Sequence, residues 1–384
     1  MQHSDGRILT THTGSLPRGE ALERLLIAQE AGQAVDGATL AGEVDAAVQR
    51  VIRHQAAAGV DIANNGEQPR VGFQTYVAQR MAGFGGESTR ASGLDFKNYP
   101  DWAAMVAATY RKAAKIRNAP QAVAEVRYDD LTPIVEEVDQ FLARAEGQDF
   151  SELFVNAPSP GIIATTLHNA YYASHEDYVM ALAREIGKEY QHIVSRGLLL
   201  QIDAPDLAME RTVMFQDKSL AEFQAMTELH VAAINRALGD IPPERVRLHA
   251  CWGNWHGPHD SDVPLADVLP LLYQARVGGL SIPFANPAHA HELSALREHP
   301  LPPEMLLLPG VIDPTTAFVE HPQVVAQRLE EAARAVGDPT RIVASTDCGF
   351  GTFAGYGVLT ADVVWAKLAA MRKGADIASG RLWG

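Results

Sequence analysis

A short apolar run followed by a long amphipathic stretch recurs along the chain, and this repeated pattern restricts the folds that the chain can adopt. Each apolar run ends in polar, glycine or proline residues, as the buried strands of a parallel sheet do. The intervening stretches carry apolar residues at helical spacing and end at glycine, as 175–197 and 221–239 do. The eight runs cover residues 8–15, 59–67, 152–160, 197–206, 245–253, 278–286, 305–313 and 341–349. Eight consecutive βα units predict an α/β fold, a (β/α)8 TIM barrel.

One interval does not fit the pattern, because residues 84–150 are too long for a single helix between the second and third strands. Within it, residues 122–130 have the composition of an extra strand, which we expect in an inserted hairpin or subdomain. A helical stretch at 19–31 and the residues before 8 also lie outside the repeat. We therefore predict one barrel domain over 1–384, with an N-terminal extension and an insertion at 84–150.

Composition excludes several classes of partner. The formal net charge of -15 argues against nucleic acid and anionic membranes. The sequence has no run of about 18 apolar residues, and its first residues lack the apolar centre of a signal peptide. Two distant cysteines do not make a disulfide framework. We expect a cytoplasmic protein, with free thiols, that acts on small molecules.

The polar residues of the eight units gather where the strands end, and the carboxyl ends of barrel strands carry the chemistry of this fold. Strands commonly end in polar residues, which accounts for an Asp or an Asn. It does not account for both cysteines of the chain falling at such ends. The residues concerned are His12, Ser15, Asn65, Glu67, Asn156, Ser159, Asp203, Asp206, His249, Cys251, Asn286, Asp313, Asp347 and Cys348.

His249 and Cys251 are two residues apart, so on a strand their side chains point the same way. The closed barrel can bring Cys348, at the end of the eighth strand, to the same mouth. One imidazole and two thiolates suit Zn²⁺, and three protein ligands with a fourth position open are typical of catalytic zinc. The spacing alone also fits two ordinary buried core residues.

Five segments at these strand ends resemble the cobalamin-independent methionine synthase family. They are THTGSLPR (11–18), NGEQPRVGFQTYV (65–77), LQIDAPDLA (200–208), LHACWGN (248–254) and STDCGFG (345–351). The resemblance is to the catalytic C-terminal barrel of that family and to its short single-barrel relatives, which include the epoxyalkane:coenzyme M transferases. It covers essentially the whole chain.

The resemblance implies a zinc ion held by His249, Cys251 and Cys348. In the family, zinc binds the acceptor thiol, lowers its pKa and presents it as the nucleophile that attacks an activated carbon. A thiol that coordinates zinc is deprotonated at neutral pH, whereas a free thiol is mostly protonated.

The same resemblance implies that three residues bind the amino-acid part of homocysteine, which would place the protein in methionine biosynthesis. Glu67 and Asp203 would pair with its ammonium group, and the Ser15 hydroxyl with nearby backbone would hold its carboxylate. Glu67 and Asp203, together with Asp313 after the seventh strand, are the candidate catalytic residues.

Two departures from the family pattern stand out. The synthases place a glutamate ligand at the end of the sixth strand, where this chain has Pro283, which cannot bind zinc. The side chains that could substitute for it are His256, His259, His289 and Asp347.

The second departure concerns the proton donor. The family carries a histidine acid after the seventh strand, but Pro314 and Thr315 stand near that place. Both departures favour a donor other than methyl-folate, such as an epoxide, a sulfonium or another activated alkyl group.

Three further residues are candidates for substrate binding. Arg18 and Arg70 follow strand ends and could hold an anionic substrate group, or be ordinary surface arginines. Trp252 could wall an apolar or cationic substrate, or simply pack. His12 is expected near the site or as a brace for its loop.

These observations predict a zinc-dependent alkyl or methyl transferase that acts on a homocysteine-like or coenzyme M-like thiol. The donors considered are methyl-folate, a sulfonium and an epoxide. Two alternatives are a zinc hydrolase that uses the open metal position and a barrel that binds zinc or thiols without catalysis. The sequence does not fix the oligomeric state, and a homo-oligomer is compatible with it.

Overall fold

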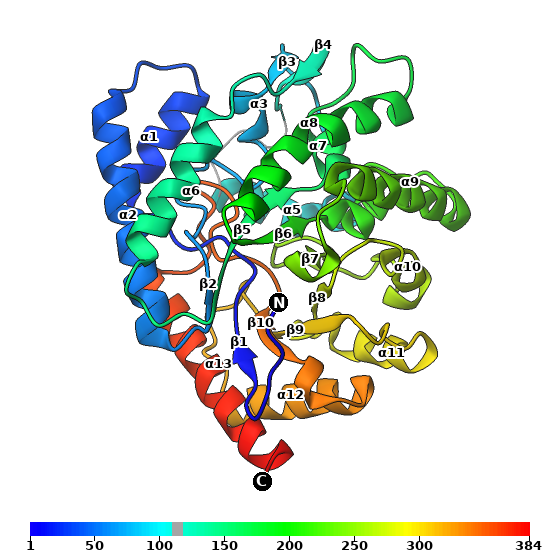
Figure 1. Ribbon diagram of the computed structural model, residues 1–384. Coiled ribbons are helices and arrows are strands. Elements are labelled where there is room, and N and C mark those ends of the chain that lie inside the picture. The colour runs from blue at the N-terminus through cyan, green and yellow to red at the C-terminus, as the bar shows by residue number, and fades with distance from the viewer. Residues whose placement is uncertain (110–117) are drawn as a thin grey trace.

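The protein is a barrel of eight parallel strands surrounded by helices (Figure 1). The computed structural model describes residues 1–109 and 118–384. The hydrogen-bonded order around the barrel is β1-β10-β9-β8-β7-β6-β5-β2. The strands are β1 (Leu9–Thr10), β2 (Ile62–Ala63), β5 (Glu152–Pro158), β6 (Leu199–Asp203), β7 (Val246–His249), β8 (Gly279–Pro283), β9 (Leu306–Ile312) and β10 (Val343–Thr346).

Each of these strands lies within one of the eight predicted apolar runs, so the predicted barrel is confirmed. Two contacts join the first and second strands where the hydrogen-bonded order ends. The amide of Asp61 donates to the carbonyl of Thr10 at 3.0 Å, and the Thr11 hydroxyl donates to the carbonyl of Ile62 at 2.9 Å.

Helices cover the outside of the strands (Figure 1). Several begin and end at the signals expected from sequence: α9 starts with a capping box made by Ser219 and Glu222, and α12 ends at Gly337 in the left-handed conformation. The helices are α1 (Glu20–Glu30), α2 (Gly37–Ala58), α3 (Val77–Arg80), α4 (Leu94–Asn98), α5 (Pro100–Thr109), α6 (Thr132–Ala145), α7 (Pro160–Thr166), α8 (His175–Ser195), α9 (Leu220–Leu238), α10 (Leu265–Leu272), α11 (Ala295–Glu298), α12 (Pro322–Val336) and α13 (Ala361–Leu382). Within the described residues, no helix is long and apolar enough to cross a membrane.

The extra strand expected at 122–130 is present between the second and third barrel strands. It forms β4 (Gln121–Arg127), which pairs antiparallel with β3 (Ala82–Gly85). The last part of the predicted insertion forms α6, which packs against α2 and α8 in the ring of helices. Residues 110–117, which the predicted insertion also covers, lie outside the described residues.

The inward-facing side chains form layers that lead up to the strand ends. An apolar layer contains Leu199 and Phe154 with inward side chains of neighbouring strands. Above it, the Arg247 guanidinium lies over the Phe154 ring at 3.6 Å and donates to Gln201 at 2.7 Å. Because inward side chains alternate along a strand, the next inward residues are Asp203 on β6 and His249 on β7, and the two are paired in register.

A buried ion-pair network fastens the loop after β2 to the helices. Arg70 lies 3.0 Å from Glu137, and Arg80 binds both Glu137 and Glu189. The arginine pair holds the pKa of Glu137 at about 2, although burial acts in the opposite direction. The opposite charges of this network therefore stabilise one another inside the protein.

Replacing Glu137 by alanine is expected to destabilise the fold by about 3–5 kcal/mol, because it leaves two buried guanidinium groups short of their partner. Denaturant unfolding at pH 7 measures this change. Glu136→Ala is the matched control, because Glu136 is the exposed neighbour on the same helix. Equal unfolding free energies for the two variants would contradict the role given to the network.

Candidate metal centre and active site

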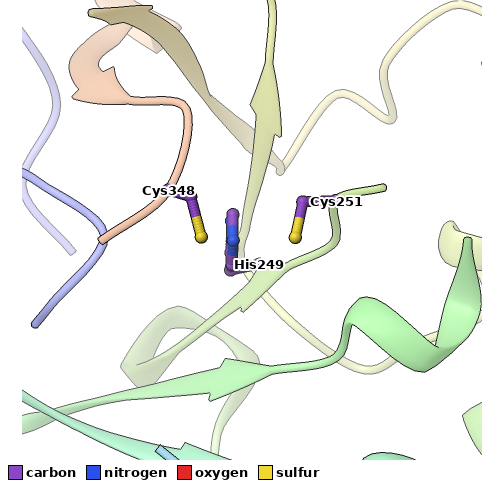
Figure 2. Close-up of side chains that lie close together, drawn as sticks. All are labelled: His249, Cys251 and Cys348. Atoms are coloured by element: carbon purple, nitrogen blue, oxygen red, sulfur yellow. The ribbon is translucent and has the colours of Figure 1, made fainter. Parts of the chain in front are cut away.

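His249, Cys251 and Cys348 meet at the carboxyl ends of the strands (Figure 2). His249 is the last residue of β7, Cys251 follows it on the same segment, and Cys348 follows β10. Figure 2 shows the two cysteines on either side of the His249 ring. Their candidate ligand atoms all lie within 4.8 Å of one another. The structure thus brings together the three residues predicted as metal ligands, although Cys348 lies 97 residues after Cys251 in the sequence.

The His249 ring is the observation that most strongly indicates a metal. Its residue is 2% exposed, yet neither ring nitrogen has a hydrogen-bond partner among the described residues. Leaving a buried polar group without a partner costs about 1–3 kcal/mol. An ion bound by one imidazole and two thiolates would remove that cost, and this donor set suits zinc. The residues present therefore fit the metal that the sequence predicts.

The two cysteines differ in their affinity for protons. The hydrogen bond with Cys348 holds the pKa of Cys251 well below its usual range, and the nearby His249 imidazole acts in the same direction. The same contact and burial raise the pKa of Cys348. Cys251 is therefore the cysteine of the pair that loses its proton more readily.

Asp203 is paired in register with His249 of this centre, and Glu67 lies close enough to Asp203 for their charges to interact. Glu67 is 2% exposed, and its Oε2 atom has no hydrogen-bond partner within the described part of the chain. Burial and the negative charge of Asp203 raise the pKa of Glu67 to about 8. Its backbone has φ of 54°, a conformation that costs a non-glycine residue free energy and is concentrated at functional sites. Glu67 is thus held in place with its Oε2 atom unpaired among the described residues.

The other residues of this region are tied to their surroundings. Asp203 accepts hydrogen bonds from Asn156 at 2.9 Å and from Gln201 at 2.7 Å. Ser15 lies against the loop after Cys348, since its hydroxyl accepts from the amide of Gly351 at 3.3 Å. A Cβ atom at Gly349 would overlap the Ser15 hydroxyl, so that close approach requires glycine.

Comparison with known proteins gives relatives that match almost the whole chain. The chain is 26% identical over 369 residues to the methionine synthase of Thermococcus kodakarensis, covering 96% of this chain and 92% of the relative. It is 23% identical over 334 residues to 2-hydroxypropyl-CoM lyase of Xanthobacter autotrophicus, covering 79% and 78%. No family model matches the chain.

Among solved structures, a B12-independent methionine synthase from Shewanella sp. W3-18-1, in complex with selenomethionine, superposes with a TM-score of 0.72. The match has 21% sequence identity and covers 98% of this chain and 99% of that one. The chain resembles the cobalamin-independent methionine synthase family. The resemblance seen in its sequence motifs is therefore confirmed, and so is the barrel fold.

Pro283, at the place where the methionine synthases are expected to carry a glutamate ligand, lines the same pocket as Cys251 and Cys348. It ends β8, and its side chain offers no ligand atom to a metal. Two of the side chains predicted to substitute for the glutamate ligand do not point to that role. His256 is exposed, and the Asp347 carboxylate accepts three backbone N–H groups, from residues 284–286 at 2.8–3.0 Å.

Asp347 instead holds together two strand ends of the methionine synthase-like barrel. Its hydrogen bonds fasten the segment after β8 to the end of β10. Burial raises its pKa to about 7. Two other suggested substitutes, His259 and His289, each contact the carboxylate of Asp262.

The arginines that we proposed for an anionic substrate group are buried rather than exposed. Arg18 donates to the carbonyl of Glu67 at 2.7 Å and to that of Gly351. Arg70 contacts Glu137 and donates to the carbonyl of Asn156 at 2.8 Å. These contacts indicate that both guanidinium groups brace the loops of the site.

Trp252 and Asp313 also line the pocket next to the two cysteines. The Trp252 indole donates to the carbonyl of Val263 at 2.7 Å, and its ring stacks on His289 with centroids 3.7 Å apart. Asp313 accepts from the amide and the hydroxyl of Thr315. Its carboxylate therefore shapes the turn formed by residues 313–315.

His12 lies outside the metal centre and braces the barrel. Its Nε2 atom contacts Gln55 at 2.8 Å, and burial lowers its pKa to about 4. Sequence reasoning missed two other polar residues, Gln201 and Arg247, because they lie mid-strand and below the strand ends. Their inward direction, two residues before Asp203 and His249, is the signal that could have found them.

Proposed function

We propose that the protein is a zinc-dependent thiol alkyltransferase of the methionine synthase type. The relatives support a methyltransferase or alkyltransferase enzyme. The observation that carries the proposal is the buried His249 imidazole, whose nitrogens have no hydrogen-bond partner in the described chain, between two cysteines. Bound by His249, Cys251 and Cys348, Zn²⁺ would supply a Lewis acid that keeps an incoming thiol deprotonated at neutral pH.

The residues around the centre favour a thiol that carries an ammonium group. Glu67 and Asp203 are two buried carboxyl groups whose pKa values are raised, mainly by burial. An ammonium ion placed between them would relieve their mutual repulsion and make charge-assisted hydrogen bonds. A sulfonated thiol of the coenzyme M type would instead add negative charge there. The acceptor we propose is therefore homocysteine or a close analogue.

Other residues of the chain would position this acceptor. Ser15 and the adjoining backbone face the loop after Cys348 and would hold the carboxylate of the amino acid. Arg18 would fix the loop that carries Glu67 through its contact with the Glu67 carbonyl. The alkyl donor would enter the pocket lined by Trp252 and Asp313.

The hydrolase alternative is disfavoured by the same residues. Two thiolate ligands make zinc a poorer acid toward water than three imidazoles do, and the carboxyl pair has no evident role in hydrolysis. For the donor, Pro314 and Thr315 stand where the family carries its histidine acid. This favours a sulfonium or another donor whose leaving group needs no proton.

An activity screen over pairs of thiol and donor tests the proposal. Homocysteine and coenzyme M are each combined with methyl-folate, a sulfonium and an epoxide, and S-alkylated products are measured by mass spectrometry. We expect product with homocysteine and none from the Cys251→Ser variant. Product formation with coenzyme M alone would overturn the choice of acceptor. No product from any pair, with zinc-loaded protein, would overturn the transferase.

A further inference from the structure

A second group of side chains of the types that bind metals lies beside the same pocket, whose wall includes His259 and His289. His259 and Asp262 belong to the segment after β7, and His289 belongs to the segment after β8. The Asp262 Oδ2 atom lies 2.7 Å from His259 Nδ1 and 3.0 Å from His289 Nε2. The three side chains are 3–7% exposed, and their ligand atoms lie within 4.8 Å of one another.

The hydrogen bonds of His259 require a cation at this group. Its Nε2 atom lies 3.1 Å from the carbonyl of Trp255, which can only accept, so Nε2 carries a proton. Its Nδ1 atom then faces the carboxylate of Asp262, which also accepts only. A neutral imidazole cannot satisfy both partners. Either a second proton or a metal ion must lie between His259 and Asp262.

The surroundings favour a divalent ion over a proton. Glu292 Oε1 lies 3.9 Å from His289 Nδ1, and Asp95 accepts from the His259 amide at 3.2 Å. A divalent cation would offset more of this negative charge than one proton does. His259 also shows the arrangement usual for a metal ligand, in which the other ring nitrogen donates to a backbone carbonyl.

Two separations within the group agree with those of neighbouring ligands of one ion. Neighbouring ligands about 2.1 Å from an octahedral ion lie about 3 Å apart, close to the 2.7 and 3.0 Å measured here. The His289 ring is fixed by its stack on Trp252. Among the residues described, the two non-glycine residues with positive φ are Glu67 and His259. Such strain is concentrated at functional sites.

We propose that His259, Asp262 and His289 form a second site, for a divalent transition metal ion. Imidazole and carboxylate ligands suit Mn²⁺, Fe²⁺, Co²⁺ or Zn²⁺. His259 and His289 line the pocket that Cys251 and Cys348 also line. The remaining positions on the ion would bind an oxygen-containing group of the second substrate. Metal binding at this site does not depend on the proposed thiol chemistry, whereas its role in binding the second substrate rests on the proposed function.

Cobalt titration of the chelator-stripped full-length protein tests the second site. Co²⁺ bound by thiolates gives a sulfur-to-metal charge-transfer band, whereas a site of histidines and a carboxylate gives none. We expect two Co²⁺ ions per chain, with the band from one of them. Asp262→Asn should bind one ion and keep the band. Cys251→Ser should bind one ion and lose it. His256→Gln, an exposed neighbour, should bind two.

The outcomes separate this proposal from the first metal centre. One ion per chain with the band, unchanged in Asp262→Asn, would overturn the second site and leave a proton shared between His259 and Asp262. One ion without the band, lost in Asp262→Asn, would support the second site and contradict the cysteine centre. If Asp262→Asn does not fold, His289→Gln is measured in its place, because it leaves the contact between His259 and Asp262 intact.

Discussion

Replacing Cys348 by serine is expected to remove the metal from the His249 centre and to lower the rate of alkyl transfer roughly a hundredfold or more. Changes in the residues that merely support metal ligands cost 10–100-fold in affinity or activity, so loss of a ligand should cost at least as much. Serine does not ionise at neutral pH and cannot replace the thiolate. The measurements are metal content and product formation at saturating homocysteine.

Ser345→Ala is the control for this change. Ser345 lies on β10, the strand that Cys348 follows. It is 1% exposed, and its hydroxyl has no hydrogen-bond partner in the described residues. Removing it alters the packing near the centre without touching a proposed ligand. We expect full metal content and a rate close to that of the parent protein. Retention of both metal and activity in Cys348→Ser would contradict the assignment of the three ligands.

The barrel was predictable because its signal is local. A buried strand of a parallel sheet needs only its own apolar run and the turn that follows, and residues 197–206 and 245–253 contain β6 and β7. The pairing of His249 with Cys251 follows from the alternation of side chains along one segment. Cys348 follows from the closure of the barrel, which places all carboxyl ends of the strands on one face.

The roles of the charged residues were not predictable, because their partners lie far away in the sequence. Arg70 follows a strand end, where an ordinary surface arginine is common, but its partner Glu137 lies 67 residues further on. Asp347 looks like a ligand beside Cys348, yet it binds amides 61–63 residues before it. The burial of a charge depends on such partners, and one sequence does not name them.

Replacing Glu67 by glutamine is expected to weaken the binding of homocysteine and to stabilise the fold. Loss of a hydrogen bond to a charged group costs about 1.5–3 kcal/mol, which is a rise in KM of roughly 10–100-fold. The acceptor loses one of the two carboxylates proposed to bind its ammonium group. Steady-state kinetics with homocysteine as the varied substrate measures this change.

The gain in stability of Glu67→Gln should increase with pH, because the pKa of Glu67 is raised in the folded protein. Folded Glu67 has a pKa of about 8, against 4.5 for the ordinary group, so the folded state holds a proton that the unfolded state releases between these values. The contribution of Glu67 to the free energy of unfolding is therefore fully present below pH 4.5, the ordinary pKa, and is lost as the pH rises toward 8. Glutamine cannot ionise, so the variant should be more stable at pH 7–8 by a few kcal/mol. The difference should shrink toward pH 5.

Glu331→Gln makes the same chemical change at an exposed position and should alter neither KM nor the pH dependence of unfolding. The comparison separates a binding role from a structural one. A carboxyl group that only supported the fold would be expected to destabilise the protein when replaced. A variant that binds homocysteine poorly while gaining stability at pH 8 would show that burying Glu67 beside Asp203 costs stability for the sake of binding. An unchanged KM together with unchanged stability would contradict both the raised pKa and the proposed contact with the ammonium group.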